Sequence, residues 1–126
     1  MEQFDKRQGL ILIKVRVHGT VRTEEAIFAL DTGATKTVIN RDLLLRIGYG
    51  KGSYSESLII TTGSGKESTN IVKIKSIEAI GKTRQNFNVL AYQLPVTTFV
   101  EGLLGLDFLR NTRVIVDFLH GNIIVE

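Results

Sequence analysis

The sequence predicts a single all-β domain, a small barrel or sandwich with one or two short helices. Apolar and polar residues alternate with a period of two along several runs, glycine-containing turns separate these runs, and helical patterns are confined to residues 41–47 and 107–111. With 126 residues, 43% of them hydrophobic, the chain can bury one core but is too short for two domains.

The first part of the chain is expected to form a β-hairpin that ends at an acidic residue. Residues 11–17 alternate up to the turn His18-Gly19-Thr20, and residues 22–30 alternate back toward Asp31. Residues 1–9 mix both charge signs and are expected to be a loose N-terminal extension. A carboxylate therefore stands directly after an apolar strand.

The rest of the chain shows the same signals. After a short strand at residues 37–39, Asn40 is the expected N-cap of the helix at 41–47 and Gly48 its C-terminal stop. The other expected elements are a hairpin of residues 57–61 and 68–75, strands at 77–80 and 87–91 joined by a turn at 81–83, a segment at 101–105, a short helix at 107–111, and a last hairpin of residues 114–118 and 123–125.

Composition excludes several classes of protein. The chain has no cysteine, which rules out disulfides and thiolate-bound metals, and His18 and His120 lie beside glycines in expected turns, where solvated side chains are the simpler interpretation. We expect no metal and no cofactor. No apolar run approaches the roughly 18 residues of a membrane span, and residues 1–9 do not resemble a signal peptide. The sequence thus predicts a soluble, cytoplasmic protein without a membrane partner.

The net charge of +3 raises the question of nucleic-acid binding. The basic residues are dispersed, however, because Lys14 and Arg16, like Lys73 and Lys75, alternate with Ile or Val as on the wet face of a half-buried strand. Aromatic residues make up 7% of the chain and Trp is absent, so stacking platforms for bases are few. A basic barrel that binds nucleic acid remains an alternative, but we expect no nucleic-acid partner.

Asp31 allows two interpretations. Asp-Thr-Gly is typical of a strand-end turn in which the Asp or Thr side chain caps backbone groups. Apolar, alternating sequence on both sides suggests instead that the turn is folded into the protein, where a carboxylate is costly unless the protein uses it.

Asp31-Thr32-Gly33-Ala34 resembles the active-site motif of the retropepsin-like aspartic proteases. Val38-Ile39 and the helix RDLLLRIG follow at the family's spacing, the hairpin at residues 58–74 stands where the family has its substrate-covering flap, and Gly102-Leu103-Leu104-Gly105 is similar to the second apolar-apolar-Gly signature. The resemblance covers about residues 10–125. It implies a small closed barrel with a flap hairpin.

The resemblance also implies a function and a set of site residues. Aspartic proteolysis needs two carboxylates that share one proton, and the chain has one Asp-Thr-Gly, so the expected enzyme is a homodimeric endopeptidase acting on extended peptides or unfolded proteins. The expected catalytic residues are Asp31, Thr32 and Gly33. The expected substrate-binding residues are Ala34, Ile59, Ile60, Thr62, Gly63, Ser64, Gly65, Leu103 and Leu104.

The chain departs from the retroviral members of the family in two places. Leu106 replaces the Arg that usually follows the second signature, which places the chain closer to cellular and bacterial members, and the expected flap tip, Gly63-Ser64-Gly65, is short. Because a fold does not fix a function, a domain that binds peptides or dimerises without useful catalysis remains a second hypothesis.

Overall fold

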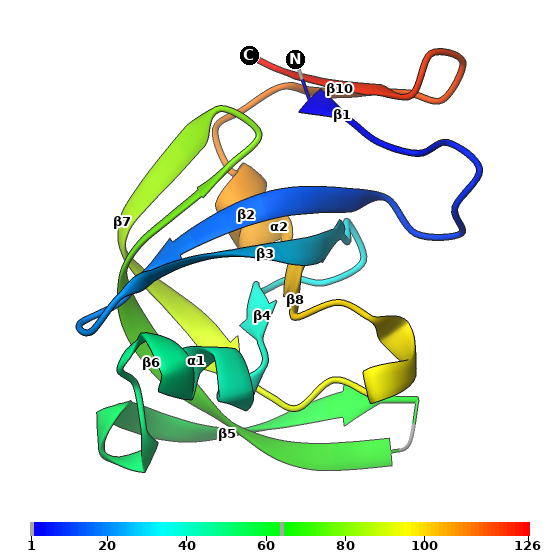
Figure 1. Cartoon of the computed structure of the whole chain (residues 1–126). Helices are drawn as coiled ribbons and strands as arrows, with labels where there is room; N and C mark the ends of the chain where they lie inside the picture. Colours follow the sequence, from blue (N-terminus) through cyan, green and yellow to red (C-terminus); the bar gives the residue numbers. More distant parts are fainter. Residues whose placement is uncertain (1, 64) are drawn as a thin grey trace.

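The alternating apolar residues form the strands of a barrel, to which short helices are added (Figure 1). The computed structural model describes residues 2–63 and 65–126, and the side chains within them except at positions 56, 57 and 62. Among these residues the elements are, in chain order, β1 (Glu2–Gln3), β2 (Leu12–His18), β3 (Thr23–Leu30), β4 (Val38–Ile39), α1 (Arg41–Ile47), η1 (Lys51–Ser53), β5 (Tyr54–Thr62), β6 (Gly65–Ala79), β7 (Lys82–Ala91), η2 (Val96–Thr98), β8 (Gly102–Leu104), α2 (Leu106–Leu109), β9 (Val114–Asp117) and β10 (Asn122–Val125).

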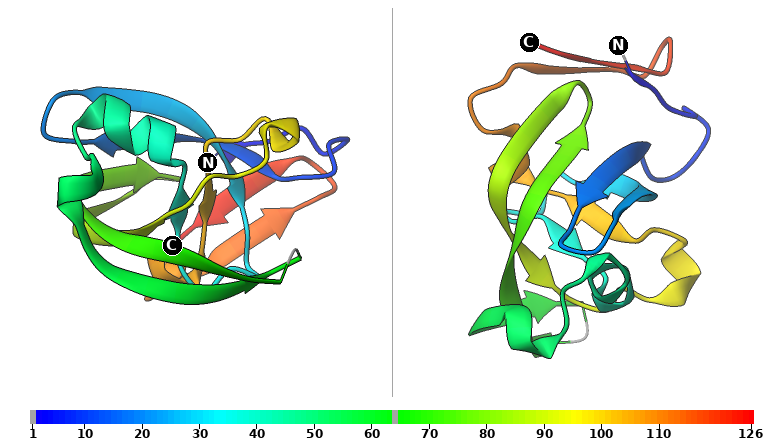
Figure 2. Two further views of the ribbon diagram at one scale, coloured as in Figure 1. Left: turned by 90° about the horizontal axis from the view of Figure 1, so that it is seen from below. Right: turned by 60° about the vertical axis from the view of Figure 1, so that its left-hand side comes forward.

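Strand β6 closes the barrel because it is long enough to pair with three neighbours. It pairs with β5 near its start, with β7 from Asn70 to Ala79, and with β2 from Ser76 to Ala79. The order β2-β3-β8-β4-β7-β6 therefore returns to β2, which confirms the expected closed barrel. A separate sheet, β1-β10-β9, lies across the end of the barrel opposite the β5–β6 hairpin (Figures 1 and 2).

Burial follows the period-two pattern of the sequence. In β2 the side chains of Ile13, Val15 and Val17 are at most 2% exposed, whereas Lys14 and Arg16 face solvent. Helix α1 covers the same core with three fully buried apolar side chains. A second, smaller cluster of buried residues lies around β4, the end of β7 and the loop after it, and consists of Ala29, Val38, Leu90, Leu94 and Val100.

Helix α1 has the bounds that the sequence predicts, but Asn40 acts differently from the expected cap. Gly48 ends the helix with φ of 113°, a conformation that favours glycine. The side chain of Asn40 makes no capping hydrogen bond. It accepts from the Leu94 amide at 2.8 Å and donates to the Val100 carbonyl at 3.4 Å, and so ties the helix start to the loop around η2.

The β6–β7 region differs from the expected pair of short strands and three-residue turn. The alternation of buried and exposed residues is interrupted at Ser76 and Ile77, which are both buried, and the sequence therefore suggests that one strand ends there. Backbone pairing nevertheless continues to Ala79. The hairpin then turns at Ile80 and Gly81, with φ of 44° and 76°. A β-branched residue rarely adopts positive φ, and Ile80 is held there by burial of its side chain, which is 7% exposed.

Two smaller expectations are also corrected. Residues 2–4 are not a loose extension, because β1 pairs with β10 and the Phe4 amide donates to the Gly121 carbonyl at 2.9 Å. His18 is not a free turn residue. It ends β2, half-buried, with Nε2 lying 2.5 Å from Oε2 of Glu78 and Nδ1 lying 2.9 Å from Oγ1 of Thr23. Thr23 lies opposite His18 in the β2–β3 hairpin, whereas Glu78 lies sixty residues away on β6, so no local pattern signals the contact with Glu78.

None of the helices in the described part of the chain is long and apolar enough to cross a membrane.

Strand β8 sits in the centre of the region that carries the Asp31 loop. It is parallel to β3 and antiparallel to β4, and it lies between them. A Cβ atom on Gly102 would lie 2.5 Å from Cζ of Phe28 and 2.6 Å from the Val38 carbonyl oxygen. Only glycine lets the two neighbouring strands approach so closely.

Replacement of Gly102 by Ala is expected to lower the free energy of unfolding by about 3 kcal/mol, because the added methyl group must displace a buried ring and a strand. Urea denaturation followed by circular dichroism measures this change. Gly52→Ala is the matched control, since a Cβ there meets no atom within 4 Å. Equal stability of the two variants would contradict the close packing of β8.

Candidate active site

Asp31 is held at the end of β3 by hydrogen bonds on both sides of its backbone and by its own carboxylate. Its amide donates to the Leu104 carbonyl at 2.9 Å, and its carbonyl accepts from the Ala34 amide at 3.1 Å. Oδ1 accepts from the Gly33 amide at 2.9 Å. The capped turn that the sequence allows is therefore present, and it fixes the orientation of a half-buried carboxylate.

Thr37 and Asp107 brace this loop from the side of the barrel. The Asp107 carboxylate accepts from the Thr37 amide at 2.9 Å, from the Thr37 hydroxyl at 2.7 Å and from the Phe108 amide at 2.8 Å. Oγ1 of Thr37, which is fully buried, in turn accepts from the Gly105 amide at 3.1 Å. Three donors on one carboxylate make a strong, charge-assisted anchor.

The backbone of the loop also contacts the second glycine signature directly. The Leu106 amide donates to the Ala34 carbonyl at 2.8 Å, and the Asp107 amide donates to the Thr35 carbonyl at 3.2 Å. A Cβ on Gly105 would lie 2.7 Å from the Lys36 carbonyl carbon. This bracing uses the backbone of Leu106 rather than its side chain.

A groove of about 490 Å³ opens beside Asp31 and runs beneath the β5–β6 hairpin. Most of its exposed lining is apolar, as expected for a site that takes side chains out of water. The lining residues are Asp31, Gly33, Ala34, Val38, Ile60, Thr61, Gly63, Tyr92, Leu94, Pro95 and Leu103. Among these residues Asp31 is the only carboxylate.

The groove brings together only part of the sequence-predicted set. Asp31, Gly33, Ala34, Ile60, Gly63 and Leu103 line it. Thr32 is exposed next to it, and Gly65 is exposed with φ of 109°. Ser64 lies outside the described residues, as does the side chain of Thr62.

Ile59 and Leu104 are placed away from the groove. Ile59 is 75% exposed on the opposite side of its strand, and Leu104 is fully buried in the main core. Neighbouring residues of a strand point to opposite faces, so Ile59 cannot share the side of Ile60, nor Leu104 that of Leu103.

Sequence reasoning missed the residues that the loop after β7 brings to the groove. Tyr92, Leu94 and Pro95 line it, although they lie about sixty residues from Asp31 in the chain. Thr37 and Asp107 were missed as well. The only available signal for Asp107 was its place two residues after Gly105, the last residue of the second glycine signature.

Replacement of Asp107 by Asn is expected to lower the free energy of unfolding by about 2 kcal/mol, because one carboxylate oxygen becomes an amide donor facing buried donors. Chemical denaturation measures the loss. Asp5→Asn changes a carboxylate on the surface and should leave the midpoint almost unchanged. If Asp107→Asn behaved like Asp5→Asn, the anchor would not support the loop.

Comparison with known proteins agrees with this arrangement. The profile of the family described as "gag-polyprotein putative aspartyl protease" matches residues 17–111. The crystal structure of a retropepsin-like aspartic protease from Rickettsia conorii superposes with a TM-score of 0.67 at 17% sequence identity, over 98% of this chain and 86% of that one, which shows a shared fold. No curated protein sequence matches the chain significantly. With Asp31 of the Asp-Thr-Gly motif and the second glycine signature both inside the matched region, the chain belongs to the retropepsin-like aspartyl protease family of the Gag-polyprotein type.

Proposed function

We propose that the protein is a homodimeric aspartic endopeptidase. The observation that carries the proposal is the anchored Asp31 carboxylate, which is the only carboxylate among the described residues of an apolar groove. Hydrolysis by this chemistry needs a second carboxylate within a few ångströms. A second subunit is the source that the sequence provides, with the two Asp31 residues meeting across a two-fold axis.

The mechanism follows from two carboxyl groups that share one proton, since like charges at such close range cannot both remain ionised. The ionised group accepts a proton from a water molecule held between the two, and the protonated group donates to the carbonyl oxygen of the scissile peptide. The Gly33 amide, which donates to Oδ1, orients each carboxylate. Within the described structure no hydrogen bond uses Oδ2, so this oxygen is available for the water.

The shape of the subunit supports dimerisation through the side that carries Asp31. The 31–36 loop, the η2 turn, the C-terminal end of β5 and the β9–β10 turn all lie toward one side of the barrel, on the right in Figure 1 (Figures 1 and 2). Two of these segments carry exposed apolar side chains: Phe99 at the end of η2 is 89% exposed, and Phe118 and Leu119 in the β9–β10 turn are 62% and 73% exposed. Such groups favour a protein partner.

The substrate in this proposal is an extended peptide that lies between the Asp31 loop and the β5–β6 hairpin, which acts as the flap. An extended chain presents its side chains alternately to two faces, so every second side chain can enter the apolar groove. Ile60, Leu94 and Leu103 favour hydrophobic side chains next to the scissile bond.

Asp31→Asn should reduce cleavage of a peptide library by about a thousandfold or more, because a neutral amide cannot serve as the base. Mass spectrometry of the products measures activity, and circular dichroism checks that the variant is folded. Retained cleavage would end the proposal. A domain that only binds peptides would show no cleavage in either form.

Mixing the two forms tests the shared site. When wild type is equilibrated with a ninefold excess of Asp31→Asn, only about one in ten of the dimers that contain a given wild-type subunit has a second wild-type subunit. Activity per wild-type subunit should therefore fall to roughly a tenth. A monomeric enzyme would keep its full activity in the mixture.

Thr32→Ala is expected to weaken the dimer by about tenfold, because the Thr32 hydroxyl, which has no partner within the described subunit, is available to bond across the axis. Sedimentation velocity over a range of protein concentrations measures the change. Thr32→Ser retains the hydroxyl and should dimerise like wild type. Equal weakening by both variants would show that the methyl group, rather than the hydroxyl, matters.

A further inference from the structure

The β5–β6 hairpin carries an acidic side chain on its groove-facing side. Ile60, which lines the groove, pairs directly with Glu67 across the hairpin, and Leu58 pairs with Thr69 in the same way. Directly paired residues share one face of a sheet. Thr69 is fully buried and donates to the Ala91 carbonyl at 2.5 Å, which confirms that this is the inner face.

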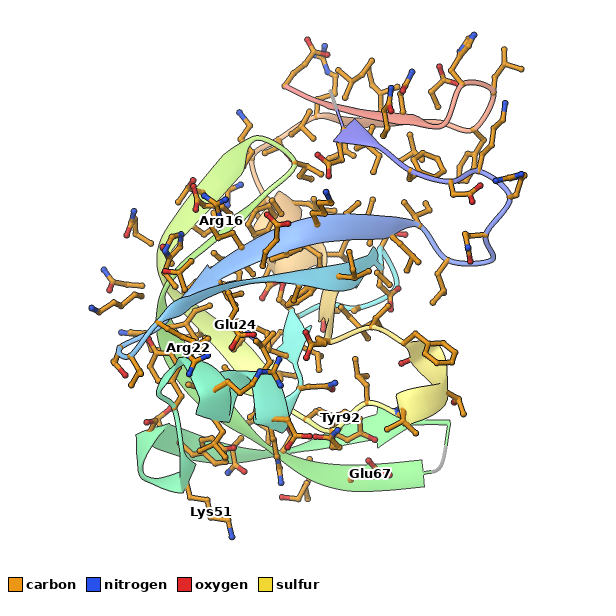
Figure 3. The ribbon with its side chains drawn as sticks, in the orientation of Figure 1. Arg16, Arg22, Glu24, Lys51, Glu67 and Tyr92 are labelled. Carbon is orange, nitrogen blue, oxygen red and sulfur yellow. The ribbon has the colours of Figure 1, made fainter. Side chains whose placement is uncertain are left out.

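The carboxylate of Glu67 reaches the far wall of the groove. Tyr92, at the end of β7, lines the groove, and its hydroxyl donates to Oε2 of Glu67 (Figure 3). Both side chains are half-buried. The pair therefore stands at the edge of the groove, where the β5–β6 hairpin meets the end of β7.

The negative charge of Glu67 is not neutralised within the described subunit. A phenol hydroxyl is a neutral donor, and no Lys or Arg of the described residues lies within 4 Å of this carboxylate. Other glutamates are paired, such as Glu25 with Arg16 at 3.8 Å and Glu101 with Arg46 at 2.5 Å. The groove thus has an apolar floor and an unneutralised acid at its edge.

We propose that Glu67 is a specificity-determining residue that selects peptides with a Lys or Arg side chain at the position beneath the β5–β6 hairpin of each subunit. This rests on the proposed function. The apolar stem of such a side chain would pack against Ile60 and Leu94. Its cationic head would make a charge-assisted hydrogen bond to Glu67, a stronger partner for the carboxylate than the Tyr92 hydroxyl that occupies it in the free subunit.

A purely structural role for the pair makes a different prediction. If the contact only fastens the hairpin to the barrel, loss of either partner should affect all peptides alike. Glu67→Gln removes the charge but keeps an acceptor for the Tyr92 hydroxyl, whereas Tyr92→Phe removes the donor and keeps the charge. The two substitutions therefore separate charge selection from fastening.

The test measures binding, so that it does not depend on catalysis. Fluorescein-labelled decapeptides with a Leu- and Ala-rich sequence carry Lys, norleucine or Glu at each position in turn, and fluorescence anisotropy gives their Kd for the Asp31→Asn protein. Norleucine matches the Lys stem without the charge. At a position that lies beneath either hairpin, a Lys peptide should bind about tenfold tighter than the norleucine peptide, and the Glu peptide more weakly than either.

The variants are made in the same Asp31→Asn background. Glu67→Gln should bring the ratio of the affinities for the Lys and norleucine peptides close to one, whereas Tyr92→Phe should leave this ratio unchanged. Glu25→Gln, the same charge change outside the groove, should keep it as well. A ratio near one at every position, or a ratio that survives Glu67→Gln, would overturn the inference.

Cleavage of the same peptides by wild type separates this inference from the proposed function. Charge selection in binding without any cleavage would refute the protease while leaving the role of Glu67 intact. Cleavage without charge selection would refute the role of Glu67 while leaving the proposed protease activity intact.

Discussion

The carboxylate of Asp107 is the interaction on which the arrangement of the groove depends. It collects donors from Thr37 and Phe108, and Thr37 in turn receives the Gly105 amide, so the loop after β3, the end of β8 and the start of α2 are fixed to one another. These groups are far apart in the chain and largely buried, where an unpaired donor would be costly. The network thereby holds the Asp31 loop against the end of β8, where the Asp31 amide donates to the Leu104 carbonyl.

Close backbone packing also holds the same region together. Gly102 and Gly105 let β3, β4 and the 31–36 loop approach β8 at distances that exclude any side chain. The β5–β6 hairpin, which covers the groove, is held differently, through side-chain contacts such as Tyr92 with Glu67 and Thr69 with Ala91. A closely packed Asp31 loop and a β5–β6 hairpin held by a few polar contacts suit a site that must fix its carboxylate and admit an extended peptide.

The apolar groove and the exposed loops together explain why one subunit is only half of the proposed enzyme. Asp31 has hydrogen-bond partners that orient it but no second carboxylate among the described lining residues. Phe99 at the end of η2, and Phe118 and Leu119 in the β9–β10 turn, are exposed apolar side chains. The need for a second carboxylate and the exposed apolar side chains therefore both favour a second copy of this chain as the partner.

The sequence alone determined most of the strands, α1 and the Asp-Thr-Gly loop, because period-two burial, a glycine stop and a strand-end turn are local properties that backbone geometry imposes. It could not place Ile59 and Leu104, since which face of a strand meets the groove depends on the register of distant strands. The sequence also could not identify Tyr92 as the hydrogen-bond partner of Glu67. Tyr92 meets that residue only because β6 and β7 pair and the chain then returns across the groove. Long-range pairing, which no local pattern encodes, decided the composition of the site.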